Sequence, residues 1–116
     1  TLAQKQALLE LFQYYVAQGP HSNNTALCGS SLDRFMHDVT LSTELENMQD
    51  AVFLVLAWRL QLSKFLSIGC EEWMNGFFFH GCFDMHAIQR AVRGWWDDAA
   101  RKDSYSRFYA FVYEYM

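Results

Sequence analysis

Apolar residues recur at helical spacing in six successive segments of this chain, and no segment sustains the alternation of a half-buried strand. The first segment runs from about Leu2 to Ala17. The third begins after Thr43, continues to about Leu62 and is apolar almost all round. We therefore predict an all-α fold of about six helices, in which the third is the central, buried element.

Capping signals predict where these helices begin. The second helix follows the capping-box pattern of Ser30 with Asp33, and the third follows that of Thr43 with Glu46. The fifth helix follows a single cap at Asp84, and the sixth follows a single cap at either Asp103 or Ser104. Two acidic residues, Glu71 and Glu72, favour the first turn of the fourth helix, because negative charge suits the positive end of a helix dipole. Its expected buried stripe is Trp73, Met74, Phe77 and Phe78.

The stretches Gln18–Ser31, which holds the single proline Pro20, and Ser63–Gly69 are predicted to be loops. The resulting helix–loop–helix rhythm predicts two EF-hand-like units. Calcium binding by such a loop requires closely spaced side-chain oxygens that end in a bidentate Glu. The first loop has no acid before Asp33, and Gln61–Cys70 has none at all. We therefore expect EF-hand-like units without calcium ligands.

Charge and cysteine content exclude several classes of protein. The chain has 13 acidic and 9 basic residues, a net charge of -4 and no basic run, so we expect no nucleic-acid partner. Its longest apolar stretches, such as Ala51–Trp58, are too short to span a membrane. The cysteines Cys28, Cys70 and Cys82 form no CxxC pair, which favours a reduced cytoplasmic or nuclear setting over a disulfide framework.

Catalytic and metal-binding patterns are weak. A zinc site built from Cys70, His80, Cys82 and His86 is one alternative, although the spacing matches no usual zinc motif. Cys82 near His86, or the adjacent acids Asp97 and Asp98, would be the only material for an active site, and no catalytic signature surrounds either. We predict a chain that is not an enzyme and that binds no metal or cofactor.

Aromatic residues exceed what one small core requires. In 116 residues there are ten Phe, six Tyr and four Trp, and Trp95 and Trp96 cannot both face the same core from one helix. The surplus favours a protein-interaction surface. One hypothesis is therefore a degenerate EF-hand-like module that docks a helix of an unrelated partner in an aromatic groove.

The order of several short motifs resembles the potentiating-neddylation (PONY) domain of the defective-in-cullin-neddylation family. The motifs are Ala57-Trp58-Arg59-Leu60, the stretch Gly69–Gly76, Gly81-Cys82 and the stretch Arg107–Phe111. From about Phe53 to Met116 the register is ungapped, and Leu11–Tyr15 and Leu32–Asp38 resemble the family's first two helices. The resemblance covers nearly all of residues 1–116 but only about the N-terminal half of the family's domain, so the cullin-docking C-terminal lobe is expected to be absent.

The resemblance implies a scaffold-type co-ligase that promotes transfer of the ubiquitin-like modifier Nedd8 to cullins. Such proteins bind the acetylated N-terminal tail of the Nedd8-conjugating enzyme in an apolar pocket, and they dock cullin-RING ligase subunits through the second lobe. Catalysis of this kind is proximity and orientation, because the thioester chemistry belongs to the conjugating enzyme.

Carried over position by position, the resemblance implies a tail pocket of nine apolar or aromatic residues. They are Leu32, Phe53, Leu56, Ala57, Leu60, Phe65, Leu66, Ile68 and Tyr115. The main-chain carbonyl of Phe65 is expected to accept the amide hydrogen bond of the tail. Phe53 and Phe65 stand where the family more often has a small aliphatic and a polar residue, and Ile68 replaces a usual Phe. These departures predict a pocket that is narrowed or filled.

Overall fold

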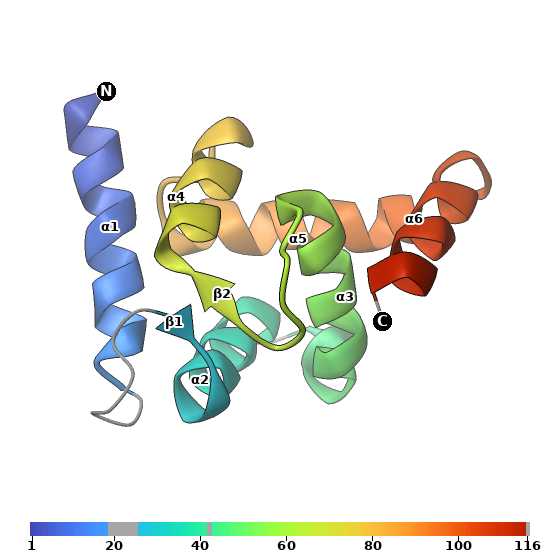
Figure 1. Ribbon diagram of the computed structural model, residues 1–116, viewed down its shortest axis with the longest axis horizontal. Helices are drawn as coiled ribbons and strands as arrows, with labels where there is room; N and C mark the ends of the chain where they lie inside the picture. Colours follow the sequence, from blue (N-terminus) through green and yellow to red (C-terminus); the bar gives the residue numbers. More distant parts are fainter. Residues whose placement is uncertain (19–25, 42, 116) are drawn as a thin grey trace.

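The computed structural model describes residues 1–18, 26–41 and 43–115, with the side chains of Glu44 and Lys102–Ser104 left out. Within these ranges the chain forms six α-helices, one short 3-10 helix and one two-stranded ladder (Figure 1). The prediction of an all-α fold is confirmed. The α-helices are α1 (Leu2–Val16), α2 (Gly29–Thr40), α3 (Gln49–Leu60), α4 (Cys70–Phe79), α5 (Met85–Ala100) and α6 (Lys102–Tyr115). The 3-10 helix is η1 (Glu44–Met48).

A short antiparallel ladder joins the two loops that separate α1 from α2 and α3 from α4. Strand β1 (Ala26–Leu27) pairs with β2 (Ile68–Gly69), with Leu27 opposite Ile68. Both of these side chains are buried. Sequence periodicity did not predict the ladder, because two residues are too few to establish alternation. Much of the expected first loop, including Pro20, lies outside the described residues, and the expected boundary at Ser31 is wrong because α2 already begins at Gly29.

Some helix caps are as predicted and others differ. Asp84 Oδ1 accepts the amide of Ala87 at 2.8 Å, which confirms the start of α5. Thr43 caps η1 rather than α3 directly, since its hydroxyl accepts the amide of Leu45 at 3.1 Å. The capping box expected at Ser30 is wrong, because the residue that caps α2 is Cys28, two residues earlier. Ser31 Oγ instead accepts the Cys28 amide at 3.1 Å and donates to the Cys28 carbonyl at 2.8 Å.

The sixth helix also starts earlier than expected. Since α6 begins at Lys102, Asp103 and Ser104 lie inside the helix, and neither is the residue that precedes it. The buried stripe of α4 is narrower than predicted: Trp73 and Phe77 are buried, Met74 is half-buried and Phe78 is exposed. Phe78 instead packs against Phe83, with ring centroids 5.6 Å apart, on the surface of the molecule.

An aromatic cluster forms the part of the core between α1, α2 and α4. Trp73 lies at its centre, with its ring centroid 5.5 Å from Phe12, 5.0 Å from Phe35 and 4.8 Å from Phe77. The pairs meet edge to face, which is a favoured geometry for aromatic rings. Figure 1 shows α1 standing beside α4. The ring contacts of the cluster join these two helices to α2.

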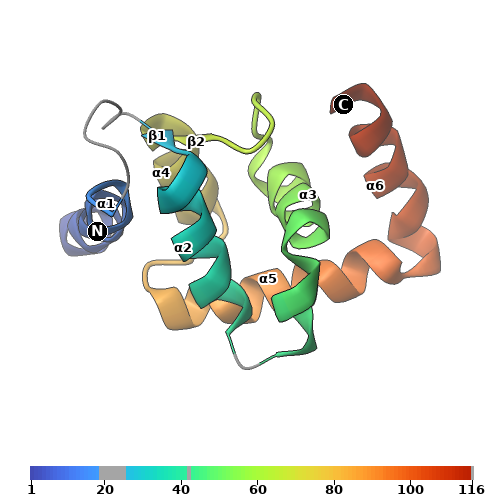
Figure 2. The same cartoon turned by 90° about the horizontal axis from the view of Figure 1, so that it is seen from below.

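Helix α5 supports the rest of the fold. It packs against α2, α3 and α6, and Figure 2 shows it running across the ends of the first two to reach the third. Its buried face consists of Ile88, Val92, Trp95 and Ala99. The predicted central helix α3 buries Val52, Phe53, Val55, Leu56, Ala57 and Leu60. Within the described part of the chain, no helix is long and apolar enough to cross a membrane.

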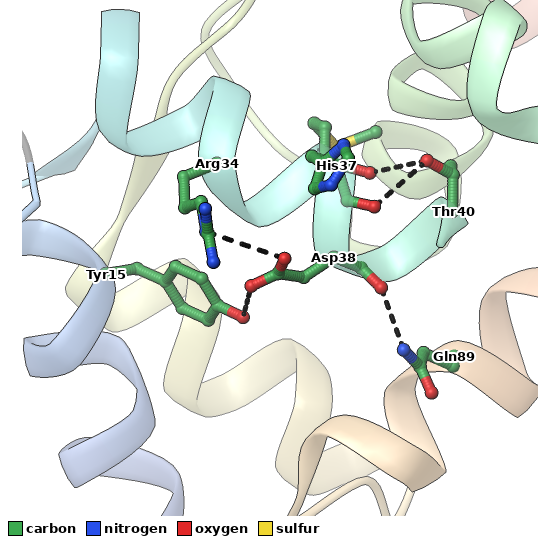
Figure 3. A network of polar contacts seen from close by, with 7 residues as sticks. Tyr15, Arg34, His37, Asp38, Thr40 and Gln89 are labelled. Carbon is green, nitrogen blue, oxygen red and sulfur yellow. Dashed lines mark hydrogen bonds and ion pairs between the residues drawn. The ribbon is translucent and has the colours of Figure 1, made fainter. Parts of the chain in front are cut away.

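A polar network ties α1, α2 and α5 together beside this core (Figure 3). The Tyr15 hydroxyl donates to Asp38 Oδ2 at 2.7 Å, and Arg34 pairs with the other oxygen of that carboxylate at 3.6 Å. The Gln89 amide nitrogen donates to the Asp38 carbonyl at 2.8 Å. Burial, followed by the hydrogen bond and the charge of Asp38, raises the pKa of Tyr15 well above its usual range.

Candidate functional site

The nine residues expected to line a pocket fall into two groups in the structure. Leu32, Phe53, Leu56, Ala57, Leu60 and Ile68 are buried in the core. Phe65 and Leu66 are exposed on the loop between α3 and β2, and Tyr115 is half-buried at the end of α6. The first group belongs to the hydrophobic core, and only the second group is accessible to a ligand without rearrangement.

Phe65 joins the two groups. Its ring centroid lies 6.1 Å from that of Phe53 on α3 and 6.1 Å from that of Tyr115 on α6, with both contacts edge to face. Tyr115 in turn stacks on Phe111 at 5.1 Å, with an interplanar angle of 19°. Residues from three elements, 62 positions apart in the sequence between Phe53 and Tyr115, therefore form one aromatic row. The Phe65 ring therefore lies between Phe53 on α3 and Tyr115 at the end of α6.

Hydrogen bonds hold the base of the loop. The Glu72 carboxylate accepts the amide of Ser63 at 2.7 Å, the hydroxyl of Ser63 at 3.0 Å and the amide of Gly69 at 3.2 Å. Glu72 therefore fixes both ends of the loop from the first turn of α4. Burial of the Tyr115 hydroxyl and, to a smaller extent, the negative charge of Glu72 raise the pKa of Tyr115.

The tip of the loop is held from α6. The Tyr115 hydroxyl donates to the main-chain carbonyl of Lys64, the residue before Phe65. Leu66, the residue after Phe65, has φ of 55°, a left-handed conformation that is unfavourable for a branched side chain. The tip is therefore a strained turn that is kept in place by contacts with α3 and α6.

A separate apolar cleft of about 360 Å³ lies between α3, α5 and α6. Its lining contains no charged residue: Ala51, Leu54, Val55, Trp96, Ala99, Ala100, Phe108, Tyr109 and Val112. None of the nine expected pocket residues lines it. One sequence signal pointed to this surface, namely the pair Trp95 and Trp96. Trp95 is buried and Trp96 lines the cleft.

Arg59, from the Ala57–Leu60 motif, links α3 to α5. Its guanidinium pairs with Asp98 at 3.2 Å and lies over the Trp58 ring, 4.1 Å from the centroid. The His80 ring meets the Arg59 main-chain carbonyl through Nε2 at 3.1 Å and packs against Trp95 at 4.8 Å. These contacts give Arg59 and His80 structural roles at the junction of α3, α4 and α5.

The residues of the alternative zinc site are not brought together. Among residues 1–18, 26–41 and 43–115, no three His, Cys, Asp or Glu side chains form a group that could hold a metal ion. Cys82 is buried and its thiol donates to the His80 carbonyl at 3.7 Å, whereas His86 is exposed on α5. Burial, and to a smaller extent the charge of Asp84, raises the pKa of the Cys82 thiol. A raised pKa is the opposite of what a thiolate ligand or nucleophile requires.

The sequence matches no protein-family model, and no curated protein is similar to it at a significant level.

Proposed function

We propose that this chain is a scaffold-type co-ligase of the defective-in-cullin-neddylation type, which binds the acetylated N-terminal tail of a Nedd8-conjugating enzyme at the aromatic row of Phe53, Phe65 and Tyr115. The observation that carries the proposal is the convergence of these residues. The motif resemblance selected them from three distant segments, and each ring centroid lies 6.1 Å from the next along the row.

The chemistry of this row suits an apolar N-terminal residue whose amine is acetylated. An acetylated terminus has lost its positive charge, so it can be placed against aromatic rings without the cost of desolvating an ammonium group. Specificity would come from main-chain groups of the loop beside Phe65, because polar groups at the margin of an apolar pocket fix the orientation of a ligand.

The pairing of the loops also supports the proposal. Two helix–loop–helix units, α1 with α2 and α3 with α4, are joined through the β1–β2 ladder between their loops. Paired helix–loop–helix units of this kind support the prediction of two EF-hand-like units that was made from the helix rhythm of the sequence. We propose that cullin docking uses the second lobe of the family's domain rather than residues 1–116.

A scaffold needs no catalytic group of its own. Holding the thioester of the conjugating enzyme near the acceptor lysine supplies rate enhancement through proximity and orientation. Cys82 is buried and the pKa of its thiol is raised, so it is poorly suited to act as a nucleophile, and this is consistent with a scaffold that has no catalytic group.

The test uses a fluorescent peptide that carries the N-terminal sequence of the conjugating enzyme, in an acetylated and an unacetylated form. Fluorescence anisotropy measures the affinity of the full-length protein for each form. We expect the acetylated peptide to bind at least tenfold more tightly, which corresponds to about 1.4 kcal/mol. Equal binding of the two peptides would rule out recognition of the tail.

A second candidate function is favoured by the apolar cleft between α3, α5 and α6. An uncharged cleft of about 360 Å³ suits the apolar anchor of an amphipathic helix, so the chain would be an EF-hand-like interaction module with an unrelated partner. Val112→Arg would place a charge in this cleft and should abolish such binding, whereas Tyr113→Arg should not. If Val112→Arg leaves all partner binding unchanged, the cleft is not the binding surface.

A further inference from the structure

Phe65 combines features that a purely structural residue does not require. Its side chain is 49% exposed, yet its ring contacts aromatic rings on two helices. Phe53, which it contacts, is only 1% exposed. The Phe65 ring therefore covers part of the core at the place where the proposed ligand would bind.

The loop around Phe65 is fixed unevenly. Its base is held by three hydrogen bonds from Ser63 and Gly69 to the Glu72 carboxylate. Its tip is held by the hydrogen bond from Tyr115 to the Lys64 carbonyl and by the ring contacts of Phe65. Hydrogen bonds to the charged Glu72 carboxylate at the base are stronger than the hydrogen bond to the neutral Lys64 carbonyl at the tip. Movement of this loop would therefore be confined to Lys64–Leu66.

The backbone at the tip also favours movement. Leu66 has φ of 55° although its side chain is 40% exposed. A non-glycine residue in the left-handed region persists only where surrounding contacts hold it. Release of the Tyr115 hydrogen bond would allow the turn to relax and the Phe65 ring to swing outward.

We propose that Phe65 is a gate that closes the tail pocket, that Tyr115 holds the gate shut, and that a ligand's apolar side chain enters only by displacing the Phe65 ring. This inference rests on the proposed function for the identity of the ligand but not for the existence of the gate. It makes Phe65 a residue that determines specificity, since displacing the ring penalises a large side chain more than a small one.

The first arm of the test measures peptide binding. Phe65→Ala removes the ring, so an acetylated peptide that begins with Met should bind at least tenfold more tightly to this variant than to the wild type. For a peptide that begins with acetylated Ala, the affinity for Phe65→Ala should exceed that for the wild type by less than threefold. Phe79→Ala is the matched control, because Phe79 is an exposed phenylalanine outside the nine expected pocket residues and should leave both affinities unchanged. If both wild type and Phe65→Ala bind the Met peptide measurably and with equal affinity, the gate is overturned.

The second arm needs no ligand. Hydrogen–deuterium exchange of the amides in Lys64–Ser67 should be at least fivefold faster in Tyr115→Phe than in the wild type, and unchanged in Tyr113→Phe. Unchanged exchange in Tyr115→Phe would overturn the assignment of Tyr115 as the holding residue. If exchange increases but no variant binds either peptide, the proposed function fails and the gate stands.

Discussion

The indole nitrogen of Trp73 on α4 donates a hydrogen bond to the main-chain carbonyl of Leu8 on α1 at a distance of 3.1 Å, inside the core. Both side chains are fully buried. A buried indole N–H needs a partner, and this one is found 65 residues away in the sequence. The bond fixes the register of α1 against α4 and thereby places the aromatic cluster.

Trp73→Phe should therefore lower the free energy of unfolding by about 2–4 kcal/mol, since it removes the hydrogen bond and leaves a cavity among Phe12, Phe35 and Phe77. Urea denaturation followed by circular dichroism measures this change. Trp96→Phe is the control, because Trp96 is only half-buried, and it should cost less than about 1 kcal/mol. A cost for Trp73→Phe no larger than that of the control would contradict the role of this residue.

The raised pKa of Tyr15 predicts a loss of stability at high pH. In the unfolded chain a tyrosine releases its proton near pH 10. In the folded chain the proton is retained to higher pH, because burial and Asp38 disfavour the phenolate. The stabilisation from Tyr15 is therefore complete below about pH 10 and is lost as the pH rises above that value.

Tyr15→Phe isolates this effect from the other tyrosines. Near pH 7 the variant should be about 1 kcal/mol less stable than the wild type, because Asp38 loses its hydrogen-bond donor. The difference should shrink as the pH rises from about 10 to 11. Unfolding free energies at a series of pH values measure it, with Tyr14→Phe on the same helix as the control. A constant difference across this range would show that Tyr15 is not the titrating group.

Most of the fold could be predicted because its signals are local. The apolar spacing of α1 and α3 and the cap at Asp84 each depend on residues a few positions apart. The Cys28–Ser31 cap escaped prediction because cysteine is an unusual residue before a helix, and the β1–β2 ladder because it has only two residues in each strand. Phe78 was expected to be buried, but α4 turns this residue toward the surface beside Phe83.

The site was harder to predict because its contacts are not local. The motif resemblance selected Phe53, Phe65 and Tyr115, and the prediction that Phe65 fills the pocket came from its size alone. No local pattern indicates that the Tyr115 hydroxyl would reach the Lys64 carbonyl, 51 residues earlier. The cleft between α3, α5 and α6 likewise depends on the angle at which α6 leaves α5, and helix periodicity carries no information about that angle.

The ion pair between Arg59 and Asp98 should contribute measurably to stability, because both side chains are about two-thirds buried. Asp98→Ala leaves the guanidinium without its carboxylate partner and should lower the free energy of unfolding by about 1–2 kcal/mol. The neighbouring Asp97 is more exposed and lies 4.0 Å from Arg93, so Asp97→Ala should change stability by less than about 0.5 kcal/mol. Thermal and urea denaturation of both variants give the comparison, and similar effects of the two substitutions would contradict this assignment.

Gly76 allows α4 to approach α3 closely. A Cβ atom at this position would lie 2.6 Å from Leu60 Cδ2 and 3.2 Å from Leu60 Cβ. Because Leu60 is itself buried, its side chain has little freedom to move aside. Gly76→Ala should therefore destabilise the protein by about 1–3 kcal/mol, despite the gain of up to about 1 kcal/mol that alanine brings to a helix.

Two further variants separate the close approach from helix propensity. Gly94→Ala on α5 is the matched control, since a Cβ there meets nothing within 4 Å, and it should stabilise the protein by up to about 1 kcal/mol. In the double variant Leu60→Ala with Gly76→Ala, the new methyl group has space, so the cost should be smaller than the sum of the single costs. Additive costs in the double variant, or stabilisation by Gly76→Ala alone, would show that contact with Leu60 is not the reason for glycine at this position.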